Sequence, residues 1–135
     1  MMTTTPLQQQ IDEFDAQARS QVPAGLLQDL THPIAQLIQS GAAEPALKEG
    51  APAPDFTLPD AFGNPVTLSH LLQQGPVVIT FYRGAWCPYC NLELRAYQRA
   101  LPQIQELGAS LVAISPQTPD HSLSTAEKNE LTLRS

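Results

Sequence analysis

The chain has 135 residues, which allows one domain or one domain with an appendage. Apolar residues make up 42% and charged residues only 15%, a composition typical of a packed core and not of a disordered chain. The formal net charge is −6, from 13 acidic and 7 basic residues. An acidic chain without a basic cluster is unsuited to nucleic acid or to an anionic membrane surface. We therefore expect neither a nucleic-acid partner nor a membrane partner.

The N-terminal sequence MMTTTPLQQQIDEFDAQ lacks the basic and apolar regions of a secretory signal. No apolar run approaches the roughly 20 residues of a membrane helix, so the expected location is cytoplasmic. The two cysteines, Cys87 and Cys90, are too few for the disulfide framework of a small secreted protein. A structural zinc ion would need two further ligands, and the three histidines are scattered, so we expect no metal.

Apolar side chains recur at helical spacing in the first part of the chain. One helix is predicted over 7–18 and a second over 26–38, where Pro33 would bend or restart it. Gly41 suits the position after the second helix. We expect residues 1–44 to be a helical N-terminal extension without catalytic residues. It would pack on a domain or on a second subunit. Packing on a second subunit would make the protein a homodimer.

A linker-like run of Pro, Gly and Ala follows at 45–55. Short strands are predicted at 56–58 and 66–68, joined by the loop DAFGNP, whose Gly and Asn favour a tight turn. Ser69 is in the right place to cap the N-terminus of a short helix that follows the second strand.

The next segment predicts a βαβ unit. The β-branched and aromatic run VVITFY at 77–82 is typical of a strand buried on both faces. A helix is predicted over 88–107 and a second buried strand over 111–115. The two strands should be parallel, as in other units of this kind. A further short helix is predicted to begin near Pro119. The fold class is therefore α/β.

The reactive residues lie where the first of these strands ends and the helix begins, in Cys87-Pro88-Tyr89-Cys90. The free N–H groups and positive dipole end of a helix N-terminus favour a thiolate over a thiol. Cysteines at i and i+3 of a helical turn are close enough to form a disulfide. A C-x-x-C beside a βαβ pattern indicates redox chemistry. The alternatives are two buried inert thiols or half of a zinc site.

The segment APDFTLPDAFGNPVTLSHLLQQGPVVITFYRGAWCPYCNLEL resembles the peroxiredoxin family, the alkyl hydroperoxide reductase and thiol-specific antioxidant group. The resemblance covers roughly residues 49–130 and implies a thioredoxin-like fold, three layers around a central sheet, for residues 45–135. Family members continue with an antiparallel strand pair and a last helix, which usually supply a cis-proline and a second arginine. We therefore expect a partial domain, its βαβ half, truncated at the C-terminus.

The resemblance assigns positions within the motif. Arg83 stands where the family has a proline after Phe-Tyr, and Glu93 matches a glutamate that follows the family's cysteine. In this register Cys90 takes the peroxidatic position and Cys87 replaces a threonine. In the thioredoxin register, Trp86-Cys87-Pro88-Tyr89-Cys90, Cys87 is the exposed attacking thiol and Cys90 resolves it.

The resemblance implies a thiol-dependent peroxidase that reduces hydrogen peroxide or alkyl hydroperoxides through Cys87 and Cys90. A dithiol such as thioredoxin would reset the pair, and no cofactor is needed because sulfur is the redox centre. Three residues are supporting candidates. Arg83 would stabilise a thiolate, position peroxide or cap a strand end, and Trp86 would pack around the thiols. Glu93 would relay protons or pair with a nearby arginine. A thioredoxin-like protein disulfide oxidoreductase and an inactive truncated remnant are the alternatives.

Overall fold

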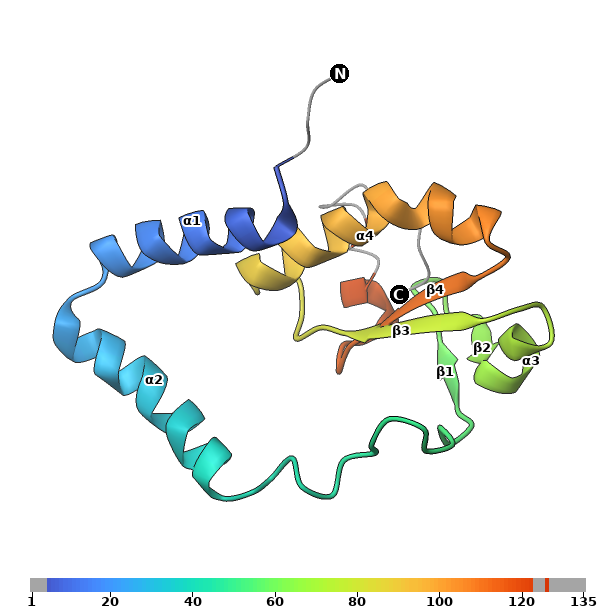
Figure 1. The fold of residues 1–135 in the computed structure, drawn as a ribbon, viewed down its shortest axis with the longest axis horizontal. Coiled ribbons are helices and arrows are strands. Elements are labelled where there is room, and N and C mark those ends of the chain that lie inside the picture. The colour runs from blue at the N-terminus through green and yellow to red at the C-terminus, as the bar shows by residue number, and fades with distance from the viewer. Residues whose placement is uncertain (1–4, 123–125, 127–135) are drawn as a thin grey trace. The chain divides into compact units, whose positions relative to one another are not determined.

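The computed structural model describes residues 5–122 and residue 126, and its contacts divide the chain into two units, Met1–Pro54 and Asp55–Ser135 (Figure 1). The predicted domain boundary between residues 44 and 45 stays a prediction. The first unit contains α1 (Leu7–Gln21) and α2 (Ala24–Gln39). The second contains, in chain order, β1 (Thr57–Pro59), β2 (Pro65–Thr67), α3 (Leu68–Leu72), β3 (Val77–Phe81), α4 (Pro88–Glu106) and β4 (Ser110–Ile114).

Both predicted helices of the N-terminal extension are present. The second runs through Pro33 as one continuous helix, so the restart predicted there does not occur. Pro33 has no N–H, so the helix lacks one backbone hydrogen bond there, and its 16 residues remain helical without it. Gly41 follows α2 with φ +68°, the left-handed conformation expected of a glycine after a helix.

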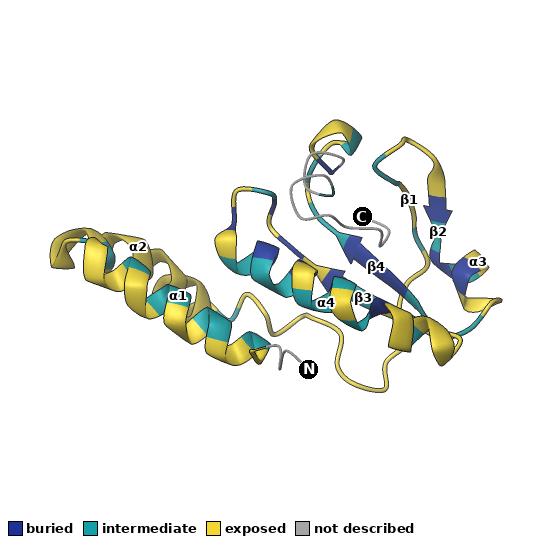
Figure 2. Cartoon of the chain, turned by 90° about the horizontal axis from the view of Figure 1, so that it is seen from above, coloured by how far each residue is buried: buried dark blue, intermediate teal, exposed yellow. Residues whose placement is uncertain are grey.

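Neither helix of the first unit contains a buried residue (Figure 2). The exposed apolar side chains of α2 recur at helical spacing along it: Leu26, Leu30, Ile34, Leu37 and Ile38. That α1 and α2 pack on a domain or on a second subunit stays a prediction.

The second unit begins with the predicted hairpin. The strands β1 and β2 are antiparallel, with Thr57 opposite Thr67. In the loop between them, Asp60 Oδ1 accepts hydrogen bonds from the N–H groups of Phe62 and Asn64, each at 2.9 Å. Gly63 has φ +83°, which a side chain would strain. The prediction of a turn at this position is confirmed.

The cap of α3 differs from the prediction. The helix begins at Leu68 after Thr67, so Ser69 lies inside the first turn. The side chain that serves this turn comes from 14 positions earlier, because Asp55 Oδ1 accepts the Ser69 N–H at 2.8 Å. Hydrogen bonds from Ser69 also hold the pKa of the Asp55 carboxyl below its usual range.

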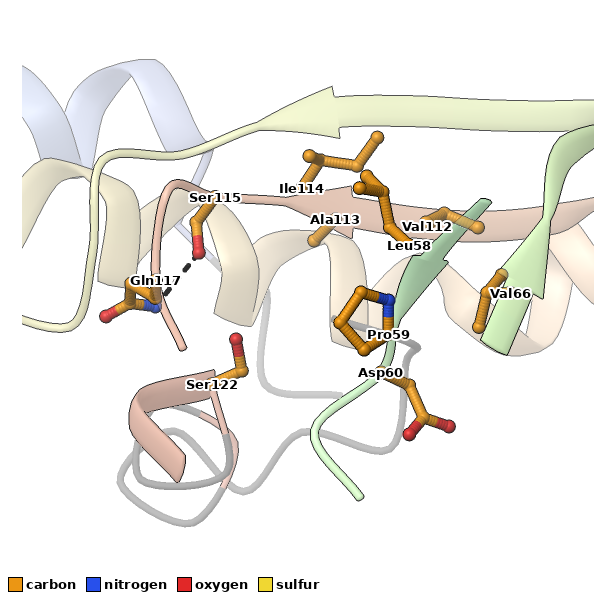
Figure 3. Close-up of a pocket in the computed structure, with 10 residues that line it drawn as sticks. All are labelled: Leu58, Pro59, Asp60, Val66, Val112, Ala113, Ile114, Ser115, Gln117 and Ser122. Atoms are coloured by element: carbon orange, nitrogen blue, oxygen red, sulfur yellow. Dashed lines mark hydrogen bonds between the residues drawn. The ribbon is translucent and has the colours of Figure 1, made fainter. Parts of the chain in front are cut away.

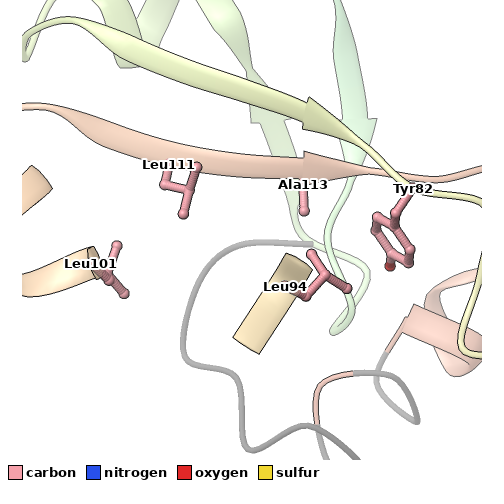
Figure 4. Packing of buried hydrophobic residues seen from close by; sticks show 5 residues of the cluster. All are labelled: Tyr82, Leu94, Leu101, Leu111 and Ala113. Atoms are coloured by element: carbon pink, nitrogen blue, oxygen red, sulfur yellow. The ribbon is translucent and has the colours of Figure 1, made fainter. Parts of the chain in front are cut away.

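The predicted βαβ unit is confirmed. The strands β3 and β4 pair in parallel, from Val77 opposite Ser110 to Phe81 opposite Ile114. α4 covers one face of the pair through a buried cluster (Figure 4): Tyr82, Leu94, Leu101, Leu111 and Ala113. The hairpin and α3 cover the other face through a second cluster: Val66, Leu71 and Val112. Successive residues of β4 thus face opposite layers, and the unit has three layers.

The prediction that β3 is buried on both faces is wrong. Only Thr80 is buried, whereas the side chains of Val78 and Phe81 are 37% and 74% exposed. The reason is pairing, since among the described residues β3 is hydrogen-bonded to β4 alone. A strand with an open edge lacks the neighbours that bury both of its faces.

Two further features complete the unit. The loops before β3 and before β4 meet backbone to backbone, because a Cβ on Gly75, whose φ is +151°, would lie 2.1 Å from the Gly108 carbonyl oxygen. Residues 119–122 are helical, as predicted near Pro119, and the rest of that predicted helix falls largely outside the described residues. In the part of the chain that the structure describes, no helix is long and apolar enough to cross a membrane.

Candidate active site

The loop from β3 to α4 brings the motif to the end of the strand pair. The Tyr82 N–H donates to the Ile114 carbonyl at 3.0 Å, which extends the pairing of β3 with β4 by one residue. The chain then turns at Gly84, where φ is +151° and a Cβ would lie 2.6 Å from the Trp86 indole nitrogen. The Cys87 N–H closes the turn by donating to the Gly84 carbonyl at 3.1 Å. Another residue would be strained at this φ and would displace the Trp86 ring.

Cys87 is the N-cap of α4, and Pro88 is its first helical residue, as predicted. Cys87 Sγ accepts the Cys90 N–H at 3.4 Å, the bond that a serine or aspartate oxygen makes at this position. Because the sulfur turns inward to make this bond, Cys87 is only 1% exposed, while Cys90 is half-buried. The thioredoxin register implies that Cys87 is exposed, and this expectation is wrong. Both thiols are free.

The two thiols and one arginine form a compact cluster. Cys90 Sγ donates to Cys87 Sγ at 2.8 Å, and Arg83 Nη2 donates to the same sulfur at 3.5 Å. The Arg83 backbone N–H donates to Cys90 Sγ at 3.5 Å. With the Cys90 N–H, three donors therefore converge on Cys87 Sγ. This is the arrangement expected around a thiolate.

This geometry shifts the two cysteine pKa values in opposite directions. Burial raises the pKa of the Cys87 thiol, but the hydrogen bonds from Cys90 and from Arg83 outweigh it and hold that pKa below its usual range. Burial and the hydrogen bond to Cys87 raise the pKa of the Cys90 thiol. The first negative charge on the pair therefore resides on Cys87.

Trp86 contacts the cluster through Arg83. The Arg83 guanidinium carbon lies 4.8 Å from the centroid of the Trp86 ring, within range of a cation–π interaction. Trp86 was predicted to pack around the thiols. It is 68% exposed and lies against Arg83 at the surface.

Glu93 lies on α4, one turn after Cys90. Its Oε1 accepts from the Thr80 hydroxyl of β3 at 3.5 Å. This bond joins Glu93 to β3. The roles predicted for it, proton relay or pairing with a nearby arginine, stay predictions.

Two residues that hold the loop were not predicted from the sequence. Gln117 Oε1 accepts the Ala85 N–H at 3.2 Å, and Asn91 Nδ2 donates to the Ala85 carbonyl at 2.9 Å. Gln117 Nε2 in turn donates to Tyr82 Oη at 3.1 Å and to Ser115 Oγ at 3.0 Å. Asn91 could have been noticed, since it follows the second cysteine. Gln117 carries no local signal, because it is 32 positions from Ala85.

A pocket of about 90 Å³ lies between the hairpin and β4 (Figure 3). Its walls combine apolar residues of β1, β2 and β4 with polar groups at one end, among them Ser115, Gln117 and Ser122. Neither cysteine lines the pocket, so the pocket and the thiol pair are separate. Gln117 lines the pocket and also holds the loop that carries Cys87. Among the described residues no cluster of His, Cys, Asp or Glu could hold a metal ion.

Most of the second unit is similar to known proteins. The model of the AhpC/TSA family matches residues 50–134. Peroxiredoxin Bcp of Escherichia coli is 32% identical over 85 residues, which cover 63% of this chain and 54% of the relative. The crystal structure of Peroxidoxin BcpB from Mycobacterium tuberculosis has a TM-score of 0.62 and 35% identity, covering 65% of this chain and 57% of that one.

The fold itself is shared more widely. The thioredoxin domain of a thiol-disulfide oxidoreductase from Bacteroides vulgatus has a TM-score of 0.55 at 22% identity, covering 66% of this chain and 63% of that one. The chain spans about half the length of the curated relatives it matches, from 44% to 54%. With most of its second unit matched by the family model and by these structures, the chain belongs to the AhpC/TSA family, the peroxiredoxins, and carries part of their thioredoxin-like fold.

Proposed function

We propose that the chain is a thiol-dependent peroxidase that reduces hydrogen peroxide or alkyl hydroperoxides through Cys87 and Cys90. The observation that carries the proposal is the convergence of three donors on Cys87 Sγ: the Cys90 thiol, the Cys90 N–H and the Arg83 guanidinium. Peroxide reduction needs a thiolate at neutral pH, and these donors favour one. Membership of the peroxiredoxin family supports the same chemistry.

The reaction has three steps. The Cys87 thiolate attacks the nearer oxygen of the peroxide, the O–O bond breaks, and the leaving oxygen departs as water or an alcohol after taking a proton. Cys87 becomes a sulfenic acid. The Cys90 thiol then condenses with it, releasing water and forming a disulfide. An external dithiol such as thioredoxin reduces this disulfide by exchange and is itself oxidised.

The two cysteines compete for the first step. Cys87 has the lowered pKa, whereas Cys90 is more exposed and occupies the peroxidatic position of the family register. We assign the attack to Cys87, because a protonated thiol is a far weaker nucleophile than a thiolate. The small size of hydrogen peroxide suits a buried sulfur. The proposal includes a cytoplasmic location, where dithiol donors keep both thiols reduced.

The test is consumption of hydrogen peroxide by the full chain, coupled to thioredoxin, thioredoxin reductase and NADPH. We expect Cys87→Ser and Cys90→Ser each to abolish turnover, while Ser20→Ala, on α1 in the other unit, leaves it unchanged. Turnover that persists in both cysteine variants would exclude the proposed mechanism.

A second candidate is a protein disulfide oxidoreductase. It is favoured by the 2.8 Å separation of the two sulfurs at a helix N-terminus, which suits disulfide exchange as well as peroxide reduction. Reduction of insulin disulfides by the dithiol form measures this activity. Rapid insulin reduction without peroxide consumption would favour the second candidate over the first.

A further inference from the structure

The backbone of Ala85, two residues before Cys87, is held by side chains through both its N–H and its carbonyl. Asn91 of α4 holds its carbonyl at 2.9 Å, and Gln117, beyond the end of β4, holds its N–H at 3.2 Å. Asn91 is buried, and its own N–H donates to the Cys87 carbonyl at 3.1 Å. Ala85 therefore connects the start of α4 to the segment that follows β4.

The orientation of Gln117 is determined by its partners. Its Nε2 is directed to two oxygens, Tyr82 Oη at 3.1 Å and Ser115 Oγ at 3.0 Å, which leaves Oε1 as the group that accepts from Ala85. Tyr82 is buried at the end of β3, so the amide is anchored to the strand pair. The Gln117 amide also lies close to Gly84, since a Cβ on Gly84 would be 3.2 Å from the same Oε1.

The loop that Gln117 holds determines where the charged groups meet. Arg83 and Cys87 lie on either side of Ala85, and their contact spans 3.5 Å from Nη2 to Sγ. The Cys87 N–H closes the same turn on the Gly84 carbonyl. A change in the backbone dihedral angles of Ala85 would therefore change the distance between the guanidinium and the sulfur.

We propose that Gln117 is a positioning residue for the thiol pair, which acts through Ala85 to hold Arg83 and Cys87 Sγ in contact. The inference deepens the proposed function, because it assumes that the Cys87 thiolate is the reacting group. The competing explanation is that Gln117 only fills space at the end of β4. In that case an apolar side chain of similar length would serve as well.

The experiment compares Gln117→Met with Gln105→Met, the same substitution at an exposed position of α4. The readout is the pH titration of the thiolate absorbance in the reduced full chain, with Cys87→Ser used to assign the Cys87 transition. We expect Gln117→Met to raise the pKa of Cys87, lowering its thiolate fraction at neutral pH about threefold or more, equivalent to half a pKa unit or more. Gln105→Met should titrate as the wild type does.

Tyr82→Phe provides a second test, because it removes one acceptor of Gln117 Nε2 and keeps the buried ring. We expect it to shift the Cys87 titration in the same direction, and to add little when Gln117→Met is already present. A folded Gln117→Met chain with an unchanged titration overturns the inference. If that variant does not fold, an unchanged titration of Tyr82→Phe overturns it.

These readouts separate the two proposals. A shifted titration in a chain that does not consume peroxide would retain Gln117 as a positioning residue and reject the peroxidase. If the chain consumes peroxide but Gln117→Met leaves the titration unchanged, the peroxidase is retained and the positioning role of Gln117 is rejected.

Discussion

Two identical side chains, three positions apart, acquire opposite properties in this protein. Cys87 takes the N-cap, and its sulfur accepts hydrogen bonds, whereas Cys90 lies inside the first turn, and its sulfur donates one bond to Cys87 and accepts one from the Arg83 N–H. The pKa of Cys87 is lowered and that of Cys90 is raised as a result. The motif predicts the pair but not the division of charge, which depends on the direction of each sulfur and on Arg83.

Arg83 gives a first prediction at this scale. Replacing it with Met removes the cation next to Cys87 and should raise the pKa of that thiol. Arg83 is exposed and partly screened by solvent, so we expect a decrease of about three- to tenfold in the thiolate fraction at neutral pH. The wild-type fraction should also fall with added salt. Arg99→Met, an exposed arginine of α4, is the control, and an equal effect of both variants on the thiolate absorbance would contradict the assignment.

The pH dependence is a second prediction. The lowered pKa of Cys87 places its ionisation below the ordinary cysteine value, so peroxide oxidation of the chain should rise with pH with a midpoint below pH 9.0. In Cys87→Ser the hydrogen bond to a neighbouring thiolate is absent, so the pKa of Cys90 should fall from its wild-type value. Titration of thiolate absorbance measures both. A Cys90 transition unchanged by Cys87→Ser would mean that the two thiols are not coupled.

At the scale of the elements, the sequence predicted what depends on near neighbours. Periodicity and turn residues predicted the hairpin, the parallel pair β3–β4 and the helix that begins at Pro88. The burial of β3 was mispredicted because it depends on which strands pair with it. The cap supplied by Asp55 and the bond from Gln117 to Ala85 were missed because each spans a long stretch of sequence. Thus the sequence pointed to the two cysteines and Arg83 as candidates, and that they are the reactive group stays a prediction, whereas the residues that hold the Ala85 loop were not predicted.

The contact between two loops gives a third prediction. Gly75→Ala would place a Cβ against the Gly108 carbonyl, backbone against backbone, at a φ that side chains rarely adopt. We expect a loss of about 1–3 kcal/mol in the free energy of unfolding, measured by urea denaturation. Gly25→Ala is the control, since nothing lies within 4 Å of its Cβ position and alanine favours the helix. Equal stability of the two variants would show that the loops do not meet in this way.

At the scale of the whole molecule, the apolar core lies in the second unit. Among the described residues its larger cluster has five buried members, of which Leu94 is the least exposed, at 1%. Leu94→Ala should lower the free energy of unfolding by about 2–5 kcal/mol, whereas Leu107→Ala, at a residue 82% exposed, should change it little. Thermal melts followed by far-ultraviolet circular dichroism measure the difference. A wild-type melt without a cooperative transition would favour the inactive remnant instead.

We propose that Cys87 and Cys90 form a peroxide-reactive pair in which Cys87 attacks. The most direct test is the rate at which hydrogen peroxide oxidises the reduced chain, with the sulfenic acid trapped by dimedone and located by mass spectrometry. We expect a rate far above that of free cysteine and an adduct on Cys87, most abundant in Cys90→Ser. An adduct on Cys90 in the wild type would reverse the assignment of the attacking thiol. A rate equal to that of free cysteine would contradict the proposal that the pair is peroxide-reactive.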